Sequence, residues 1–297
     1  MTAPGTAAVP RLLAGIAPLL SRYDGWLLDQ WGVIHDGERL FPEAGAALER
    51  LRAAGRRVVL LSNSGRRVAH SLRHLAGMGL DPRLFDAVVT SGEVAWRLLR
   101  ERRVPPFSHL GRRCLLLTRF GDVEVVEGLD LELVDDPDAA DFVFLSGVDS
   151  PARDLDSYRP LLERAARRRL WAVCANPDRV APQGDRLILA PGAVAEAYVR
   201  MGGRVVHTGK PHPWIYREAL RRLAGIAPAR TVAVGDSYEH DVVGAVRAGL
   251  DAVFVLEGIH RTRFPPDLDG AALAAEVAEL ALRFGARPRW LLRRFAP

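Results

Sequence analysis

The chain has 297 residues, of which 48% are hydrophobic, so it can form a sizeable packed core in one large domain or two smaller ones. No apolar run is long enough to cross a membrane and residues 1–10 lack the pattern of a signal peptide, so we expect a cytoplasmic protein. The formal net charge is +5, but the basic residues are interspersed with acidic ones and form no aromatic-rich stripe, which disfavours nucleic acid as a partner.

The first strong element along the chain is a buried strand at residues 26–28. The strand ends at Asp29, and Gly32 follows in a tight turn. Ligands of open parallel sheets bind at the carboxyl ends of the strands, so a carboxylate at this point is placed for chemistry. Asp29 could equally cap the next segment, and this stretch alone does not decide between the two interpretations.

Strands and helices then alternate. Helical patterns at residues 41–54 and 66–78 alternate with the strand at residues 26–28 and strands at residues 57–61 and 87–90. Such alternation predicts parallel strands with right-handed crossovers. The second strand is followed by Ser62, Asn63, Ser64 and Gly65, a turn rich in hydroxyl and amide groups.

The middle of the chain keeps this rhythm, with strands expected at residues 114–117, 142–145 and 171–175. The last of them is followed by Asn176, Pro177 and Asp178. No low-complexity tract or long linker interrupts this part of the chain, so it is expected to form a compact inserted domain. Cys114 and Cys174 lie in apolar runs and are expected to be core residues, not a disulfide.

In the last third, a short strand begins at Val205 and leads to Thr208, Gly209 and Lys210. Lys210 is the single lysine among 41 basic residues, at a position where the compact ammonium and the forked guanidinium are not interchangeable. A buried strand at residues 231–234 is followed by Asp236 and Asp241. A strand at 252–256 and a helix at 270–284 are then expected, and the tail after them is unassigned.

These strand ends carry residue types that suit one task. Asp236, with Asp29 and Asp241, offers the hard oxygen ligands that Mg²⁺ prefers. Lys210 and the Ser62 hydroxyl can bind a phosphate, and a carboxylate next to a bound phosphate can attack phosphorus. Each feature also has a plainer interpretation as a helix cap, a turn or a surface charge. It is the less economical hypothesis that such plain interpretations hold at all four strand ends together.

The four motifs, in this order, resemble those of the haloacid dehalogenase superfamily, and most of all its subclass IIA, the p-nitrophenyl phosphatase and nucleotidase-like enzymes with an inserted α/β cap. The motifs are Asp29–Gly37, Leu61–Ser64, Thr208–Pro213 and Gly235–Gly249. The resemblance implies a doubly wound parallel-sheet core, Rossmann-like, with an inserted α/β cap domain. It implies core residues 1–91 and 203–297 and a cap at residues 92–202.

The resemblance also implies roles for individual residues. Asp29 is expected to be the nucleophile and a magnesium ligand, with Asp236, Asp241 and the main-chain carbonyl of Trp31 as further ligands. Ser62 and Lys210 are expected to bind phosphate and to take part in catalysis. Asn63, Asn176 and Asp178 are expected to contribute to substrate binding.

One position departs from the family pattern. Phosphatases of this superfamily usually carry a second aspartate two residues after the nucleophile, and here that residue is Trp31. An indole has no titratable proton near neutral pH, so general acid–base catalysis at this position is lost. His35 lies in the same motif and is a candidate substitute acid, although it can equally be a structural histidine.

The sequence therefore predicts a magnesium-dependent hydrolase that acts on a small phosphorylated metabolite through an aspartyl-phosphate, and that is slow or specialised because of Trp31. The alternative is a non-catalytic protein that binds phosphorylated ligands and retains the fold and the metal site. No nucleic-acid or membrane partner is expected. A homodimer is compatible with the resemblance.

Overall fold

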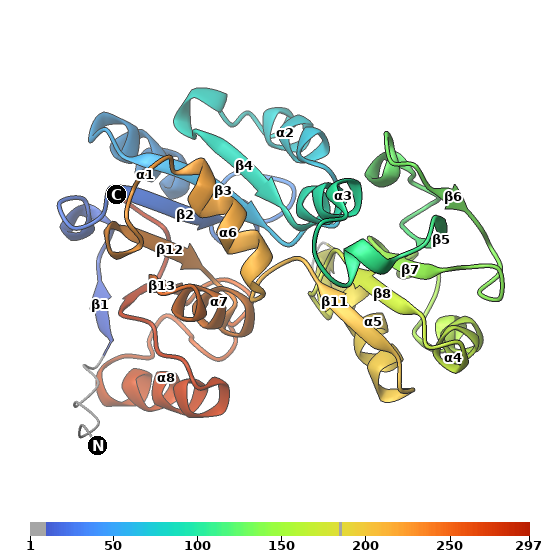
Figure 1. The fold of residues 1–297 in the computed structure, drawn as a ribbon. Helices are drawn as coiled ribbons and strands as arrows, with labels where there is room; N and C mark the ends of the chain where they lie inside the picture. The colour runs from blue at the N-terminus through green and yellow to red at the C-terminus, as the bar shows by residue number, and fades with distance from the viewer. Residues whose placement is uncertain (1–9, 184–185) are drawn as a thin grey trace, which may run out of the picture. The chain divides into compact units, whose positions relative to one another are not determined.

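In a computed structural model of the chain, residues 10–183 and 186–297 are described. The residues form two compact units (Figure 1). The first unit comprises residues up to 61, 75–88 and 216–297, and the second comprises residues 62–74 and 89–215. Among the described residues, no helix combines the length and the hydropathy that crossing a membrane requires.

A seven-stranded sheet forms the centre of the first unit. Its order is β1 (Arg11–Leu13), β14 (Trp290–Leu292), β13 (Asp251–Val255), β12 (Thr231–Gly235), β2 (Gly25–Asp29), β3 (Arg57–Ser62) and β4 (Ala87–Thr90). The strand pairs from β1 to β3 are parallel, and the last residues of β3 and β4 fall in the second unit. In β2, the side chains of Trp26, Leu27 and Leu28 are buried, as a strand covered on both faces requires. The buried strand that the sequence predicts before Asp29 is thus confirmed and is central.

The residue types at their ends explain where two helices of this unit begin or end. Helix α1 (Pro42–Ala53) begins with proline at its first turn after an extended Phe41, which is the position that proline favours. Helix α8 (Gly270–Phe284) ends at Gly285 with φ +65°, a left-handed conformation that glycine adopts readily. The other elements of this unit are η1 (Ala17–Leu19), η2 (Pro82–Leu84), α6 (Pro213–Arg222), η6 (Pro228–Arg230), η7 (Tyr238–Val242) and α7 (Val243–Arg247); α6 begins in the second unit.

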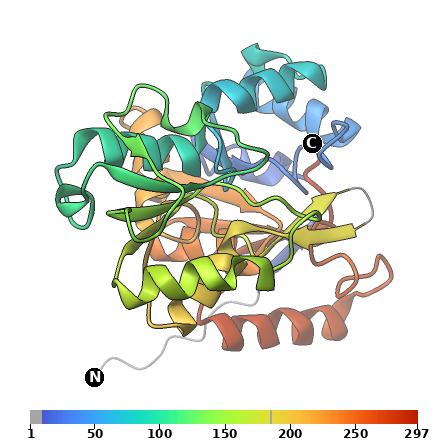
Figure 2. The same ribbon diagram turned by 90° about the vertical axis from the view of Figure 1, so that its right-hand side faces the viewer.

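A second parallel sheet organises the second unit. Its order is β11 (Arg204–His207), β8 (Trp171–Cys174), β7 (Phe142–Leu145), β5 (Arg113–Leu117) and β6 (Glu132–Leu133). The pairs β11–β8, β8–β7, β7–β5 and β5–β6 are all parallel. A two-stranded antiparallel hairpin, β9 (Val180–Gln183) and β10 (Arg186–Leu189), is yellow in Figure 2. The helical elements are α2 (Val68–Gly77), α3 (Ser91–Glu101), η3 (Phe107–His109), η4 (Glu124–Val126), η5 (Asp156–Tyr158), α4 (Arg159–Arg167) and α5 (Pro191–Arg200); α2 continues into the first unit.

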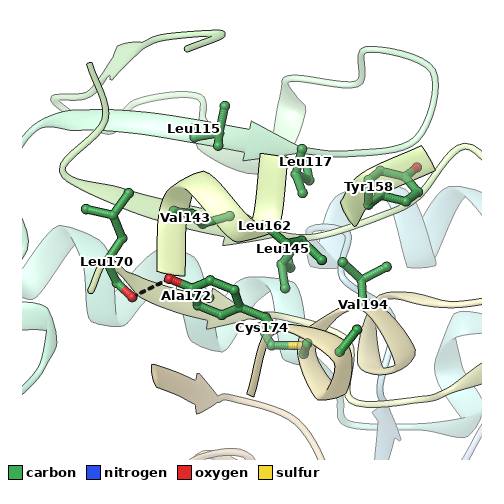
Figure 3. Packing of buried hydrophobic residues seen from close by; sticks show 14 of the residues in the cluster. Leu115, Leu117, Val143, Leu145, Tyr158, Leu162, Leu170, Ala172, Cys174 and Val194 are labelled. Carbon is green, nitrogen blue, oxygen red and sulfur yellow. Dashed lines mark hydrogen bonds between the residues drawn. The ribbon is translucent and has the colours of Figure 1, made fainter. Parts of the chain in front are cut away.

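The core of the second unit lies between this sheet and its helices (Figure 3). Leu115 and Val143 of the sheet pack in one cluster with Leu162 of α4 and Val194 of α5. The hydroxyl of Tyr198 donates to the carbonyl of Leu170 at 2.7 Å, and burial raises the pKa of Tyr198 to about 12.

The two cysteines are buried core residues, as expected. Burial raises the pKa of the thiols of Cys114 and Cys174 to about 12, so both stay protonated at neutral pH.

The architecture confirms the predicted fold class, a mixed α/β protein with parallel sheets. The predicted cap, residues 92–202, lies entirely within the second unit, which also contains 62–74, 89–91 and 203–215. Strand β11, which the sequence places in the second part of the core, pairs with β8 in the five-stranded sheet. The boundaries near residues 91 and 203 stay a prediction.

Candidate active site

Three carboxylates meet at the carboxyl ends of two central strands of the first unit. Asp29 is the last residue of β2, and Asp236 directly follows β12, the neighbouring strand. Asp241 lies in η7, a π-helical turn that begins two residues after Asp236. One oxygen atom of each carboxylate lies within 4.8 Å of the others. The structure therefore brings together the three acidic residues that the sequence predicts as magnesium ligands.

Each of these carboxylates accepts a hydrogen bond from the backbone. The N–H of Gln30 donates to Oδ1 of Asp29 at 2.8 Å. The N–H of Ile259 donates to Oδ2 of Asp236 at 2.6 Å, and the N–H of Ser237 donates to Oδ2 of Asp241 at 3.1 Å. Backbone donors of this kind fix the orientation of a carboxylate and favour its ionised form.

Two glycines let the main chain approach Asp236 closely. A Cβ atom added to Gly32, whose φ is +78°, would lie 2.0 Å from Oδ2 of Asp236. A Cβ atom added to Gly258 would lie 2.0 Å from the same oxygen. Only glycine fits at either position, and at Gly32 the backbone conformation also favours it. Asp236, which is 2% exposed, is thus enclosed by backbone from two loops.

The donor set fits a divalent cation. Three like charges at such separations repel one another, and burial makes the repulsion stronger than it would be in water. A hard cation with oxygen ligands removes this repulsion, and carboxylates with main-chain carbonyls are the ligands that Mg²⁺ uses. The residues present therefore fit magnesium, as the sequence predicts.

The loop after Asp29 is braced by Trp31. The indole Nε1 donates to the main-chain carbonyl of Asp36 at 2.8 Å, and the Trp31 ring lies against Gly37. The N–H of Gly32 donates to the carbonyl of His35 at 2.8 Å, which closes the loop on itself. The Trp31 side chain thus has a structural contact within the loop and no titratable proton near neutral pH.

His35 is buried inside the same loop. Its main chain forms single bridges with Trp31 and with Leu40, and its Nδ1 accepts the N–H of Gly37 at 3.0 Å. In the neutral ring the proton is therefore assigned to Nε2. If His35 acts as the substitute acid, Nε2 is the atom that transfers the proton.

A second group of predicted site residues meets within the second unit. The Asn63 amide donates to Oδ1 of Asp178 at 2.7 Å and to the carbonyl of Lys210 at 3.3 Å. Its own oxygen accepts the N–H of Lys210 at 2.7 Å. Both amide protons of Asn63 are thus used by the protein, so this side chain joins three separate segments and fixes the Lys210 backbone.

The remaining predicted residues lie in the turns beside this group. The Ser62 hydroxyl accepts the N–H of Ser64 at 3.2 Å, and the Asn176 side chain accepts the N–H of Asp178 at 3.0 Å. Lys210 is 2% exposed, an unusual environment for an ammonium, so it is no ordinary surface charge.

Asn63→Asp is expected to lower the free energy of unfolding by about 3–5 kcal/mol, because an aspartate would place two carboxylates against each other in a part-buried position and could not donate to the Lys210 carbonyl. Asn176→Asp is the matched control: its oxygen accepts a backbone N–H, which an aspartate also does, so we expect a change below about 1 kcal/mol. Urea unfolding of both variants measures the difference. Equal stabilities would contradict the assigned role of Asn63.

The segment that holds Asp236 was not predicted as part of the site. Gly258 and Ile259 follow β13, the strand next to β12. The sequence feature that indicates them is the one that also marks Asp29, a buried strand with a glycine shortly after its end. The next residue, His260, accepts the N–H of Tyr238 on Nε2 at 3.3 Å. Burial and then the charge of Arg263 lower the pKa of His260 below 6.5.

This pKa has a consequence for stability at acid pH. Well above pH 6.5 His260 is neutral in both states, and as the pH falls through 6.5 the unfolded chain binds a proton that the folded chain does not. The free energy of unfolding is therefore expected to fall by up to about 1.4 kcal/mol per pH unit on account of this residue. Urea unfolding at pH 7 and pH 5.5 should show a smaller loss for His260→Gln, which keeps an acceptor for Tyr238. An identical loss in the two proteins would contradict this assignment.

Comparisons with known proteins place the chain in a family. Two haloacid dehalogenase-like hydrolase models match, one at residues 26–132 and one at residues 207–280. Human chronophin is 30% identical over 260 residues, which is 84% of this chain and 86% of chronophin. The chain belongs to the haloacid dehalogenase-like hydrolases.

Other members of the family agree in sequence and structure. The sugar-phosphatase AraL of Bacillus subtilis is 26% identical over 79% of this chain and 83% of its own length. A haloacid dehalogenase-like hydrolase from Brucella suis has a TM-score of 0.81 at 34% identity and covers 96% of this chain and 100% of its own. The p-nitrophenyl phosphatase of Archaeoglobus fulgidus has a TM-score of 0.68 at 26% identity, covering 92% of this chain and 96% of its own. The chain is thus a phosphatase of the haloacid dehalogenase type, as its motifs predict.

Proposed function

We propose that the protein is a magnesium-dependent phosphomonoesterase that acts on a small phosphorylated metabolite through an aspartyl-phosphate on Asp29. The observation that carries the proposal is the meeting of Asp29, Asp236 and Asp241, each fixed by a backbone donor. Relatives are named for sugar phosphates and ribonucleotide monophosphates, and we extend that substrate class to this chain.

Residues of this chain can supply the nucleophile and the groups that bind phosphate. Lys210 and Ser62 would bind the phosphate oxygens, and Asn63 would hold the Lys210 backbone in place. The Asp29 carboxylate would attack phosphorus while the ester oxygen departs with the bonding electron pair. Water would then attack the same phosphorus, releasing phosphate and restoring Asp29.

Magnesium would be held by Asp29, Asp236, Asp241 and the main-chain carbonyl of Trp31. When bound, it would neutralise charge on the phosphate and on the carboxylates. Loss of one acidic ligand should therefore weaken both metal binding and turnover.

Trp31 accounts for the proposed low rate. The indole cannot protonate a leaving group, which restricts the first step to substrates with good leaving groups, and it cannot activate the water of the second step. His35 could act only through Nε2, since its Nδ1 accepts a backbone N–H. The cytoplasmic location and the homodimer stay predictions.

The test is steady-state hydrolysis of p-nitrophenyl phosphate with and without Mg²⁺, for the wild type and Asp29→Asn. Magnesium-dependent turnover that Asp29→Asn abolishes supports the proposal. Asp156→Asn is the control, because Asp156 is an exposed residue paired with Arg159. Turnover by Asp29→Asn at the rate of the wild type would overturn the proposal. A wild type that is inert but whose melting temperature rises with phosphate would instead favour the non-catalytic, phospholigand-binding alternative.

A further inference from the structure

The carboxyl ends of the five-stranded sheet form a second place where polar residues gather. Strands β11, β8, β7 and β5 are parallel, so the residues that follow them lie along one edge of this sheet (Figure 1). Lys210 follows β11, Asp178 follows β8 and Ser146 follows β7. Arg119 follows β5, three strands from β11, which corresponds to roughly 14 Å between the strand axes.

Among the residues that the structure describes, Arg119 is a partly buried cation with no counter-ion. Within the described ranges, its Nε is buried and has no hydrogen-bond partner, and no carboxylate pairs with its guanidinium. The one described partner of the guanidinium is the ring of Phe120, whose centroid lies 5.2 Å from the guanidinium carbon. A buried donor left unsatisfied is costly, so such a group needs a partner, and a ligand can supply one.

The acidic residues of the same loops are engaged elsewhere. Asp122 lies 3.6 Å from the Arg66 guanidinium and also accepts the N–H of Glu124. Asp149 accepts the N–H of Phe120 at 2.6 Å. The charge of Arg119 is thus left available for an anion from outside the chain.

The backbone around Arg119 is held in an uncommon conformation. Phe120 has φ +53°, which is rare for a bulky residue, and its side chain is 71% exposed. Gly147 makes room for this loop, since a Cβ atom there would lie 2.7 Å from the nitrogen of Arg119. Strained residues of this kind persist where the surrounding structure holds them, and they gather at ligand sites.

A short series of contacts links Arg119 to the turn that carries the expected phosphate ligand. Ser62 opens the turn that ends at Gly65, where a Cβ atom would lie 1.9 Å from the carbonyl oxygen of Ser146. The next residue, Gly147, contacts Arg119. The Ser62–Gly65 turn and Arg119 therefore flank the end of β7.

We propose that Arg119 binds a second anionic group of the substrate, such as a carboxylate, while the phosphate is bound at Ser62 and Lys210. The inference rests on the proposed function and makes it more specific: the substrates are phosphate esters with a further negative charge several bonds away from phosphorus. The planar guanidinium, which matches a carboxylate with two parallel N–H donors, is suited to this task.

The test compares 4-carboxyphenyl phosphate with 4-nitrophenyl phosphate in the wild type and in Arg119→Gln. The carboxylate and the nitro group have nearly the same shape and differ in charge, and differences in leaving-group reactivity cancel when the ratio of the two kcat/KM values is compared between the proteins. We expect this ratio to fall about 10- to 100-fold in Arg119→Gln, mostly through KM for the carboxylate substrate. Arg119→Lys should restore part of the ratio.

Arg167→Gln is the charge-matched control, because Arg167 is an exposed residue in the last turn of α4. A ratio that is unchanged in Arg119→Gln, or that falls as much in Arg167→Gln, would overturn the inference.

Binding of the non-hydrolysable 4-carboxybenzylphosphonate and 4-nitrobenzylphosphonate, measured by calorimetry, separates this inference from the proposed function. An Arg119-dependent preference for the carboxylate ligand in a protein that turns over neither ester would support the Arg119 site and refute the phosphatase proposal. Turnover of both esters with no such preference would support the phosphatase proposal and refute the Arg119 site.

Discussion

Trp31→Asp is expected to raise kcat for p-nitrophenyl phosphate by about 10²- to 10⁴-fold, the usual contribution of a positioned general acid–base. The p-nitrophenolate group departs without an acid, so the step that lacks assistance in the wild type is the attack of water on the aspartyl-phosphate. An aspartate at position 31 supplies the missing base for that step. The wild type should therefore release p-nitrophenol in a rapid burst followed by slow turnover, and Trp31→Asp should show no burst.

The controls for this variant separate proton transfer from loop structure. Trp31→Asn matches the aspartate in shape but has no titratable group, and both variants lose the indole bond to the Asp36 carbonyl. Stopped-flow and steady-state assays of the three proteins give the comparison. Equal rates for Trp31→Asp and Trp31→Asn would show that the loop, and not the missing carboxylate, limits the enzyme.

Asp236→Asn is expected to have opposite effects on the metal-free and the metal-bound protein. Without Mg²⁺ the variant should be more stable by about 1–3 kcal/mol, because one of three mutually repelling carboxylates is neutralised while the oxygen that accepts the Ile259 N–H is kept. Adding Mg²⁺ should raise the stability of the wild type, and the variant should bind Mg²⁺ at least about 100-fold more weakly than the wild type does.

Thermal unfolding with EDTA and with increasing Mg²⁺ measures both effects. Glu239→Gln is the matched control, since Glu239 is an exposed residue of η7 and its neutralisation changes the net charge by the same amount. The metal assignment fails if Asp236→Asn is stabilised by Mg²⁺ as much as the wild type is.

Much of the fold could be predicted because its strands are nearly continuous apolar runs. The run at Trp26–Leu28 and the run at Val232–Val234 need burial on both faces, so the strands that contain them lie side by side in the middle of a sheet. The carboxylates at their ends then meet because parallel neighbours share one edge. This reasoning requires no knowledge of the rest of the chain.

The features that could not be predicted depend on contacts between distant segments. Strand β11 has no local signal that it pairs with β8, and the hairpin strand β10 is largely exposed and lacks a core pattern. Strands β1 and β14 have three residues each and are defined mainly by their partners. Short strands of this kind carry too few residues for a period to show.

The roles of single side chains were predictable to different degrees. Residue type and position indicate what Asp236 can bind, but nothing local indicates that both protons of the Asn63 amide are used by Asp178 and Lys210. The same holds for Trp31: the resemblance predicts that the acid is replaced there, and the structure shows that the indole donates a hydrogen bond within the loop.

The central claim is that Asp29 is the nucleophile and becomes phosphorylated. It is tested most directly by quenching the wild type during turnover of p-nitrophenyl phosphate and treating the protein with borohydride, which reduces an aspartyl-phosphate to homoserine. Because Trp31 leaves the second step without a base, the phosphorylated form should accumulate, and peptide mass spectrometry should find homoserine at position 29. Turnover with unmodified Asp29, or with homoserine at another position, would contradict the account.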